Sequence, residues 1–193
     1  MSNLKGKTVG VAMTGSFCTF SRTFEAFREL AAIGANLIPI LSDAAYSCDT
    51  RFYPASEVRQ ILSEICGREP LHTVPEVEPV GPKKLLDLLI VAPCTGSTLA
   101  KLSCGIADTA PTLAVKSHLR NERPVLIAVS SNDALSRNAA SIGKLLPLRH
   151  FYFVPFGQDA PLEKPASLVA DMKSIVPAAE AALEQRQMQP ILL

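Results

Sequence analysis

The sequence has no tryptophan and only three tyrosines, and aromatic residues make up 6% of the chain. It also lacks an excess of either charge, because 19 lysines and arginines stand against 18 aspartates and glutamates, for a formal net charge of +1. No basic stripe extends beyond the pair at residues 83–84. Since nucleic acids and acidic membrane surfaces bind proteins through such stripes, both are disfavoured as partners.

Long apolar runs are also missing. The most apolar stretches, 85–94 and 125–129, are far shorter than a bilayer span, and the first contains Asp87. The first seven residues lead into an apolar segment of about six residues, which is too short for the core of a secretory signal. We therefore expect no membrane span and a cytoplasmic location.

The five cysteines are odd in number and include no CxxC pair, and only three histidines accompany them. A disulfide framework and a structural zinc site are therefore disfavoured, and we predict no metal site. What the chain does have is apolar surface: 48% of its residues are hydrophobic and 19% are charged, which favours a folded core. Its 193 residues fit one domain, predicted to span residues 1–193.

Hydrophobic periodicity predicts strands that alternate with helices. The predicted strands are 7–13, 36–41, 85–92, 124–129 and 151–154. The predicted helices are 24–33, 56–66 with Ser56 as its cap, 97–119, 133–146 and 165–187, the last kinked by Pro177 and followed by a tail at 188–193. Residues 68–84 contain four prolines and are predicted to form a surface loop outside the core.

This alternation predicts an α/β fold with a parallel sheet. Ligands of such folds bind beyond the carboxyl ends of the strands, which selects the loops at 14–21, 92–98 and 129–133. In the first loop, Gly15 and the hydroxyls around it suit a phosphate bound without lysine or arginine, although a serine-rich helix cap explains the same residues equally well. Neither a P-loop motif nor GxGxxG is present.

The segment APCTGSTLAKLSCGIADT at 92–109 is more specific. It resembles the APASANT-type motif, followed by LAK and GIAD, of the homo-oligomeric flavin-containing cysteine decarboxylase superfamily. That resemblance implies a Rossmann-like or flavodoxin-like three-layer fold, a bound FMN and a homo-oligomer, either a trimer or a dodecamer. It makes Gly15 and Ser16 candidates for the FMN phosphate, with Ser42 as a weaker one. The other implied cofactor-binding residues are Phe17, Pro93, Cys94, Thr95, Ser97, Thr98, Ser130 and Asn132.

Two departures from the superfamily bear on its chemistry. Ser97 stands where the decarboxylases have asparagine, and their PxMNxxMW substrate clamp is reduced here to residues 129–136, of which only Asn132 matches cleanly. The departures weaken a decarboxylase assignment. A stand-alone FMN-dependent decarboxylase or prenyltransferase-like enzyme nevertheless stays open as an alternative, as does a noncatalytic flavin-binding subunit.

Four further segments, EPVGP at 78–82, KSHLRN at 116–121, VPFGQD at 154–159 and QPILL at 189–193, fit one member of the superfamily along essentially the whole chain. That resemblance implies a flavoprotein subunit in the mother cell of a sporulating bacterium. It would act with a dehydrogenase-like partner subunit to oxidise a small dihydropyridine dicarboxylate to its aromatic form. The hydride acceptor stays open between FMN here and NAD or NADP on the partner.

Several single residues are candidates for chemistry. His72 is the candidate acid or base, because the unperturbed pKa of histidine lies near neutrality, with an exposed loop histidine as the alternative. Lys101 and Asp108, seven residues apart on the predicted helix, are candidates for a pair or for contact with a carboxylated ligand, with a solvated helix surface as the default explanation. Arg120 and Arg123 are candidates for binding a dicarboxylate through bidentate hydrogen bonds.

Overall fold

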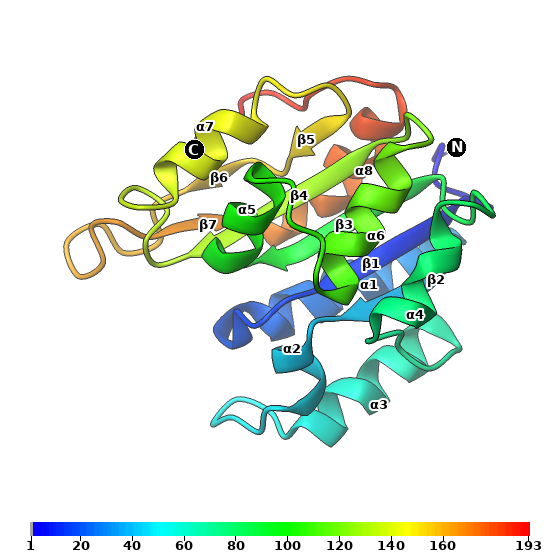
Figure 1. Cartoon of the computed structure of the whole chain (residues 1–193). Coiled ribbons are helices and arrows are strands. Elements are labelled where there is room, and N and C mark those ends of the chain that lie inside the picture. Colours follow the sequence, from blue (N-terminus) through cyan, green and yellow to red (C-terminus); the bar gives the residue numbers. More distant parts are fainter. Residues whose placement is uncertain (1) are drawn as a thin grey trace.

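The computed structural model describes residues 2–193 and consists of a mostly parallel sheet between two layers of helices (Figure 1). The strands are β1 (Thr8–Met13), β2 (Asn36–Leu41), β3 (Leu88–Cys94), β4 (Val125–Ser131), β5 (Phe151–Phe153), β6 (Phe156–Gly157) and β7 (Leu168–Ala170). Their order is β2-β1-β3-β4-β7-β6, and β5 pairs with the first half of β4. Strands β1 to β5 are parallel, whereas β7 runs antiparallel to β4 and β6. The predicted α/β fold is confirmed.

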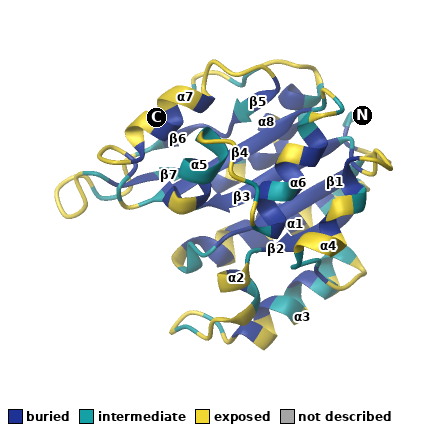
Figure 2. Ribbon diagram, in the orientation of Figure 1, coloured by how far each residue is buried: buried dark blue, intermediate teal, exposed yellow. Residues whose placement is uncertain are grey.

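Helices cover both faces of this sheet. They are α1 (Phe20–Ile33), α2 (Asp43–Ser47), α3 (Ala55–Cys66), α4 (Val74–Val77), α5 (Gly96–Ser103), α6 (Ala110–Leu119), α7 (Ala139–Leu145) and α8 (Ile175–Leu183), with the short 3-10 turns η1 (Phe17–Thr19), η2 (Glu78–Val80) and η3 (Met172–Ser174). Figure 1 shows α5 and α6 in front of the sheet and α1 and α8 behind it. Every residue of β3 is buried, as a parallel strand covered on both faces must be (Figure 2).

The first β-α-β unit follows the sequence pattern closely. Phe20, Phe24 and Phe27 lie on one side of α1 and are fully buried, and Gly34 ends the helix with φ 96°, a left-handed conformation that glycine adopts without strain. Strand β2 lies at the edge of the sheet, a position in which Pro39 is tolerated. The carbonyl of Pro39 faces outward and accepts a hydrogen bond from the amide of Leu71, so the missing N–H of the proline costs no bond to β1.

The start of α3 differs from the prediction. The helix begins at Ala55 after Pro54, so Ser56 lies inside its first turn and does not cap it. The carboxylate of Asp49 accepts the amide of Ala55 instead, at 2.7 Å. Gly67 ends the helix in the left-handed conformation.

The proline-rich segment 68–84 is not a loop outside the core. It contains α4 and η2, and Val77 and Val80 are buried in the hydrophobic core. A capping box between Thr73 and Glu76 begins α4, and a proline near the start of each short helix fits a position whose amide needs no helical partner. Prolines here begin helices, which a search for sustained periodicity does not detect.

Two predicted helices are shorter than expected. The predicted helix 97–119 is divided into α5 and α6 by residues 104–109, where Gly105 has φ 71°. The predicted helix 133–146 is helical only from Ala139, because residues 132–138 form turns around Asp133.

The predicted C-terminal helix 165–187 is wrong in its first third. Residues Leu168–Ala170 form β7, and helix α8 covers only Ile175–Leu183. Pro177 is the third residue of α8, where an amide has no helical acceptor, so it neither kinks nor divides the helix. The tail is also ordered against the sheet, since Leu192 forms a bridge with Phe156. No helix in residues 2–193 is long and apolar enough to cross a membrane.

Candidate functional site

The three loops selected from the sequence converge on one cavity of about 900 Å³. It lies beyond the carboxyl ends of β1, β3 and β4, where open α/β sheets bind their ligands. Its volume is within the roughly 300–1,000 Å³ typical of small-molecule sites. Residues from the loops after β1, β3 and β4 line it together with side chains from the α2–α3 and β6–β7 connections.

The loop after β1 contributes Gly15, Ser16, Phe17 and Cys18 to the lining. The hydroxyl of Ser16 lies 2.7 Å from that of Ser130 at the end of β4, so one hydrogen bond joins two of the three loops. Residues 17 and 18 begin η1, where backbone amides have no acceptor within the turn. This wall of the cavity therefore offers hydroxyls and free amides.

Thr14, which is fully buried, fixes the distance between the loops after β1 and β3. Its Oγ1 donates to the carbonyl of Pro93 at 2.7 Å and accepts the amide of Thr95 at 2.9 Å. Its own amide donates to the same Pro93 carbonyl at 3.2 Å. Both bonding functions of one buried hydroxyl are thus used to position the start of α5.

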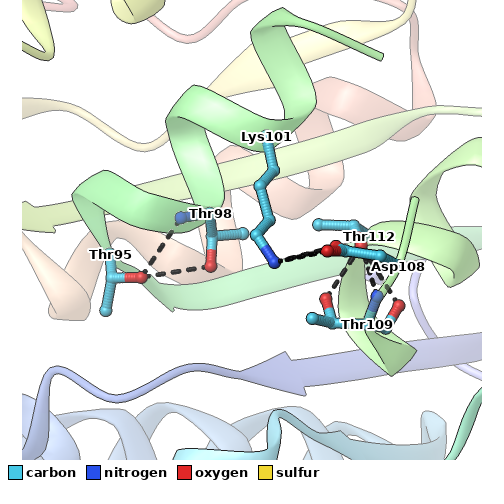
Figure 3. A network of polar contacts seen from close by, with 6 residues as sticks. All are labelled: Thr95, Thr98, Lys101, Asp108, Thr109 and Thr112. Atoms are coloured by element: carbon cyan, nitrogen blue, oxygen red, sulfur yellow. Dashed lines mark hydrogen bonds and ion pairs between the residues drawn. The ribbon is translucent and has the colours of Figure 1, made fainter. Parts of the chain in front are cut away.

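Helix α5 begins at this point with its N-terminus at the cavity. Thr95 is the N-cap, and its Oγ1 accepts the amide of Thr98 and lies 3.1 Å from the Thr98 hydroxyl (Figure 3). Gly96 and Ser97 line the cavity, and amides in the first turn of a helix have no helical acceptor. The positive end of the helix dipole thus faces the cavity.

A polar cluster packs against Gly96. The Asp133 carboxylate accepts Ser131 Oγ at 2.5 Å and both of its oxygens accept Asn138 Nδ2 at 2.9 Å. A Cβ atom on Gly96 would lie 2.5–2.7 Å from atoms of these three side chains, so the helix can approach the cluster only with glycine here. The hydrogen bond from Ser131, followed by that from Asn138, lowers the pKa of Asp133, which keeps this carboxylate ionised.

The other end of α5 is tied to the segment before α6. Lys101 Nζ lies 2.8 and 2.9 Å from the two carboxylate oxygens of Asp108, so the expected pair is present (Figure 3). The two residues are not on one helix as predicted, because α5 ends at Ser103. The hydrogen bond from Lys101 lowers the pKa of Asp108. Neither residue lines the cavity, so the pair joins the end of α5 to the segment that leads into α6.

Seven of the cofactor-binding candidates lie on the cavity: Gly15, Ser16, Phe17, Thr95, Ser97, Ser130 and Asn132. Four do not line it: Ser42, Pro93, Cys94 and Thr98. Ser42 caps α2 by accepting the amide of Ala45, and Thr98 is bonded to the α5 cap. Cys94 is fully buried, and burial raises its pKa, so its thiol stays protonated and packs as a small apolar group.

His72 also lies away from the cavity lining. It follows Leu71, which bridges to Ile40 at the outer edge of β2, and its ring stacks on that of Tyr46 with centroids 3.6 Å apart. Its Nδ1 lies 3.3 Å from a carboxylate oxygen of Glu76. The backbone amides of His72 and Thr73 donate to the same carboxylate and lower its pKa. This histidine is therefore held in place, but within its own chain it does not face the cavity.

Residues 1–180 match the family model described as Flavoprotein. The chain belongs to the Flavoprotein family. It is 38% identical over all 193 residues to the B subunit of dipicolinate synthase from Bacillus subtilis (strain 168), and the match covers 96% of that relative.

Solved structures with a similar fold support the sequence match. A crystal structure of the dipicolinate synthase B subunit from Bacillus halodurans C is 37% identical, with a TM-score of 0.91 over 99% of this chain and 98% of that one. The FMN-dependent cysteine decarboxylase SpaF is 18% identical, with a TM-score of 0.71 over 94% of this chain and 99% of that one. The second likeness shows that the fold is shared.

The charged residues that line this cavity were not predicted from the sequence, nor were some of their uncharged neighbours. The charged residues that were missed are Arg51, Asp133, Arg137, Asp159 and Lys164, and the uncharged ones are Phe52, Asn138 and Ser167. Most of them lie in irregular connections, so no hydrophobic period marks them. Asp133 and Asp159 each had a signal, since Asp133 ends the loop selected after β4 and Asp159 ends the VPFGQD segment.

The arginines proposed for a dicarboxylate, Arg120 and Arg123, are not on the cavity. Arg123 donates to the carbonyls of Lys84 and Leu86 just before β3. Arg120 follows the last residue of α6, which precedes β4, so it belongs to the opposite end of the sheet. Within residues 2–193, no three histidine, cysteine, aspartate or glutamate side chains are grouped as a metal site would require.

Proposed function

We propose that this chain is the flavoprotein component, the B subunit, of a dipicolinate synthase. The proposal is that it acts with the dehydrogenase-like A subunit to form dipicolinate, pyridine-2,6-dicarboxylate, from a dihydrodipicolinate-type precursor during sporulation. The observation that carries it is the likeness to the B subunit of dipicolinate synthase, which extends along the whole chain in sequence and in structure.

The cavity suits FMN as the proposed cofactor. Ser16 and Ser130 offer hydroxyls, and the first turns of η1 and α5 offer free amides to a phosphate, a way of binding anions that needs no cation. Phe17 and Ala100 add apolar surface to the same lining, as a flat ring system requires. Gly15 and Gly96 let the backbone approach closely, and at Gly96 no side chain fits.

The proposed reaction removes two hydrogens from the ring of the substrate, which gains aromaticity. When bound, FMN would supply the acceptor for a hydride, and a base would take the remaining proton. The protein orients the ring against the cofactor and excludes water. His72 stays the proposed base, although it does not line the cavity of its own chain. The proposed assembly is a homo-oligomer, a trimer or dodecamer.

The A subunit of dipicolinate synthase is the proposed partner, and a nicotinamide cofactor, NAD or NADP, is assigned to that partner as the alternative acceptor. The proposed location is the cytoplasm of the mother cell. A stand-alone decarboxylase is less well supported, since Ser97 replaces the motif asparagine and the substrate clamp is reduced to Asn132.

The first test is to purify the chain, record its absorption spectrum and titrate it with FMN. Saturable binding with a perturbed flavin spectrum is the expected result. Ser16→Asp places a negative charge on the cavity wall and should weaken FMN binding by about tenfold or more. Ser21→Asp adds the same charge at an exposed position of α1 outside the lining and serves as the control. Unchanged FMN affinity in the Ser16 variant would refute the proposed phosphate site.

A further inference from the structure

Two arginines on the cavity are not used by the flavin site described above. Arg51 comes from the connection between α2 and α3, and Arg137 comes from the turns between β4 and α7. Both side chains are exposed, and neither forms an ion pair with a carboxylate in residues 2–193. Guanidinium groups with free donors on a cavity wall are suited to binding carboxylates in a bidentate manner.

The two arginines approach the cavity from opposite flanks. Arg51 belongs to the segment after β2 and Arg137 to the segment after β4, and strands β1 and β3 lie between them in the sheet. Neighbouring strands are about 4.8 Å apart, so the two segments start about 14 Å from each other. Both arginines line the same cavity although they come from separate connections, an arrangement that suits a ligand with two acid groups.

An aromatic side chain accompanies the first arginine. The guanidinium carbon of Arg51 lies 4.8 Å from the centroid of the Phe52 ring, and Phe52 also lines the cavity with 43% of its surface exposed. A large apolar side chain that remains this exposed on a cavity wall is available to a flat ring. The α2–α3 connection therefore presents a cation and an aromatic face together.

The remaining charges on the cavity are already paired or bonded. Asp133 is held by Ser131 and Asn138, and Lys164 lies 3.4 Å from Asp159. The described lining thus has three cationic side chains and two carboxylates, and Arg51 and Arg137 are the two cations that form no ion pair with a carboxylate, although the charge of Arg137 contributes to the lowered pKa of Asp133. A small dianion would offer a carboxylate to each arginine.

We propose that Arg51 and Arg137 bind the two carboxylates of a small planar dicarboxylate, with Phe52 against its ring. The proposal rests on the proposed function, because it assigns the substrate-recognition residues of that same cavity. It replaces Arg120 and Arg123, which lie elsewhere. Since each carboxylate has its own arginine, removal of either arginine should weaken the binding of a dicarboxylate more than the binding of a monocarboxylate with the same ring.

The experiment measures binding of pyridine-2,6-dicarboxylate and of pyridine-2-carboxylate to the full chain by calorimetry, with and without FMN. The wild type should prefer the dicarboxylate. Arg51→Gln and Arg137→Gln should each lower the affinity for the dicarboxylate about tenfold or more and remove most of the preference for it over the monocarboxylate. The control is Arg28→Gln, which removes the same charge from an exposed position of α1 and should change neither affinity.

The titration with FMN separates this proposal from the proposed function. If both arginine variants bind FMN normally and lose only the dicarboxylate, both proposals stand. If FMN binds but the dicarboxylate affinity of the two variants equals that of the wild type, or the wild type binds no dicarboxylate, the assignment of Arg51 and Arg137 is overturned while the flavin site survives. If the variants instead lose FMN, the arginines hold the cofactor and the assignment is also overturned.

Discussion

The hydroxyls of Ser16 and Ser130 lie 2.7 Å apart although 114 positions separate them in the chain. One belongs to the loop after β1 and the other to the end of β4, with β3 between these strands in the sheet. The contact joins the loop after β1 to the end of β4, and both serines line the cavity. It is therefore a direct measure of whether the site is assembled.

Removing this contact should have a measurable pairwise effect. In a double-mutant cycle of Ser16→Ala and Ser130→Ala, we expect a coupling free energy of about 1 kcal/mol, since a net hydrogen bond contributes about that much. The measurement is urea unfolding of the wild type, the two single variants and the double variant. Fully additive effects would show that the two hydroxyls do not interact in solution.

Thr14→Val should destabilise the chain by about 1–3 kcal/mol. Valine has nearly the same shape, but it cannot accept the amide of Thr95 or donate to the carbonyl of Pro93, and a buried amide without a partner is costly. Thr8→Val is the matched control, because Thr8 is only partly buried in β1 and should change stability by less than about 0.5 kcal/mol. Equal effects of the two substitutions in thermal unfolding would contradict the role given to Thr14.

Gly96→Ala and Gly143→Ala should have opposite effects. At Gly96 the added Cβ meets Asn138, Ser131 and Asp133 at 2.5–2.7 Å, and the forced shift should cost about 1–3 kcal/mol and weaken FMN binding. At Gly143, inside α7, nothing lies within 4 Å, so alanine should stabilise the helix by about 0.5–1 kcal/mol. A Gly96 variant as stable as the wild type would show that the cluster around Asp133 is looser than described.

Stability should fall below pH 6.5 because of His118. Burial lowers its pKa to about 4, and its Nε2 lies 3.0 Å from the carbonyl of Pro124. In the unfolded chain His118 binds a proton near pH 6.5, whereas in the folded chain it does so only near pH 4. The free energy of unfolding therefore decreases as pH falls through this interval, by about 3 kcal/mol from this residue.

The measurement is the free energy of unfolding from pH 7 to pH 4 for the wild type and His118→Gln. Because other groups titrate in both proteins, the difference between the two curves isolates His118. The wild type should lose more stability than the variant. Parallel curves would show that this histidine is protonated equally easily in the folded and unfolded chains.

Local pattern predicted the segment from β1 to β2 and the end of α3 well. The β-branched run at Thr8–Met13, the phenylalanines of α1 and the terminal glycines Gly34 and Gly67 act through neighbours a few residues away, so sequence spacing describes them. The same reasoning failed at Leu168–Ala170. That segment is apolar at helical spacing, but it pairs with β4 and β6, a contact that no local period encodes.

The site was predicted only in part for a related reason. Seven cofactor candidates lie on the cavity because they follow strands whose carboxyl ends share one edge of the sheet. Arg51 and Arg137 lie in irregular segments. Their positions on the cavity depend on the tertiary arrangement of the α2–α3 and β4–α7 connections. Arg123 looked equally suitable in sequence but is used by the carbonyls before β3.

The sequence by itself determined the alternation of strands and helices, the three loops at one edge of the sheet and the membership in a flavin-associated superfamily, because these depend on short-range periodicity and on a motif within one segment. Only the tertiary structure decided that Ser16 meets Ser130, that His72 lies away from the cavity and that two arginines lie on it. These facts depend on contacts between distant segments, which form only when burial of the shared core brings the strands into one sheet.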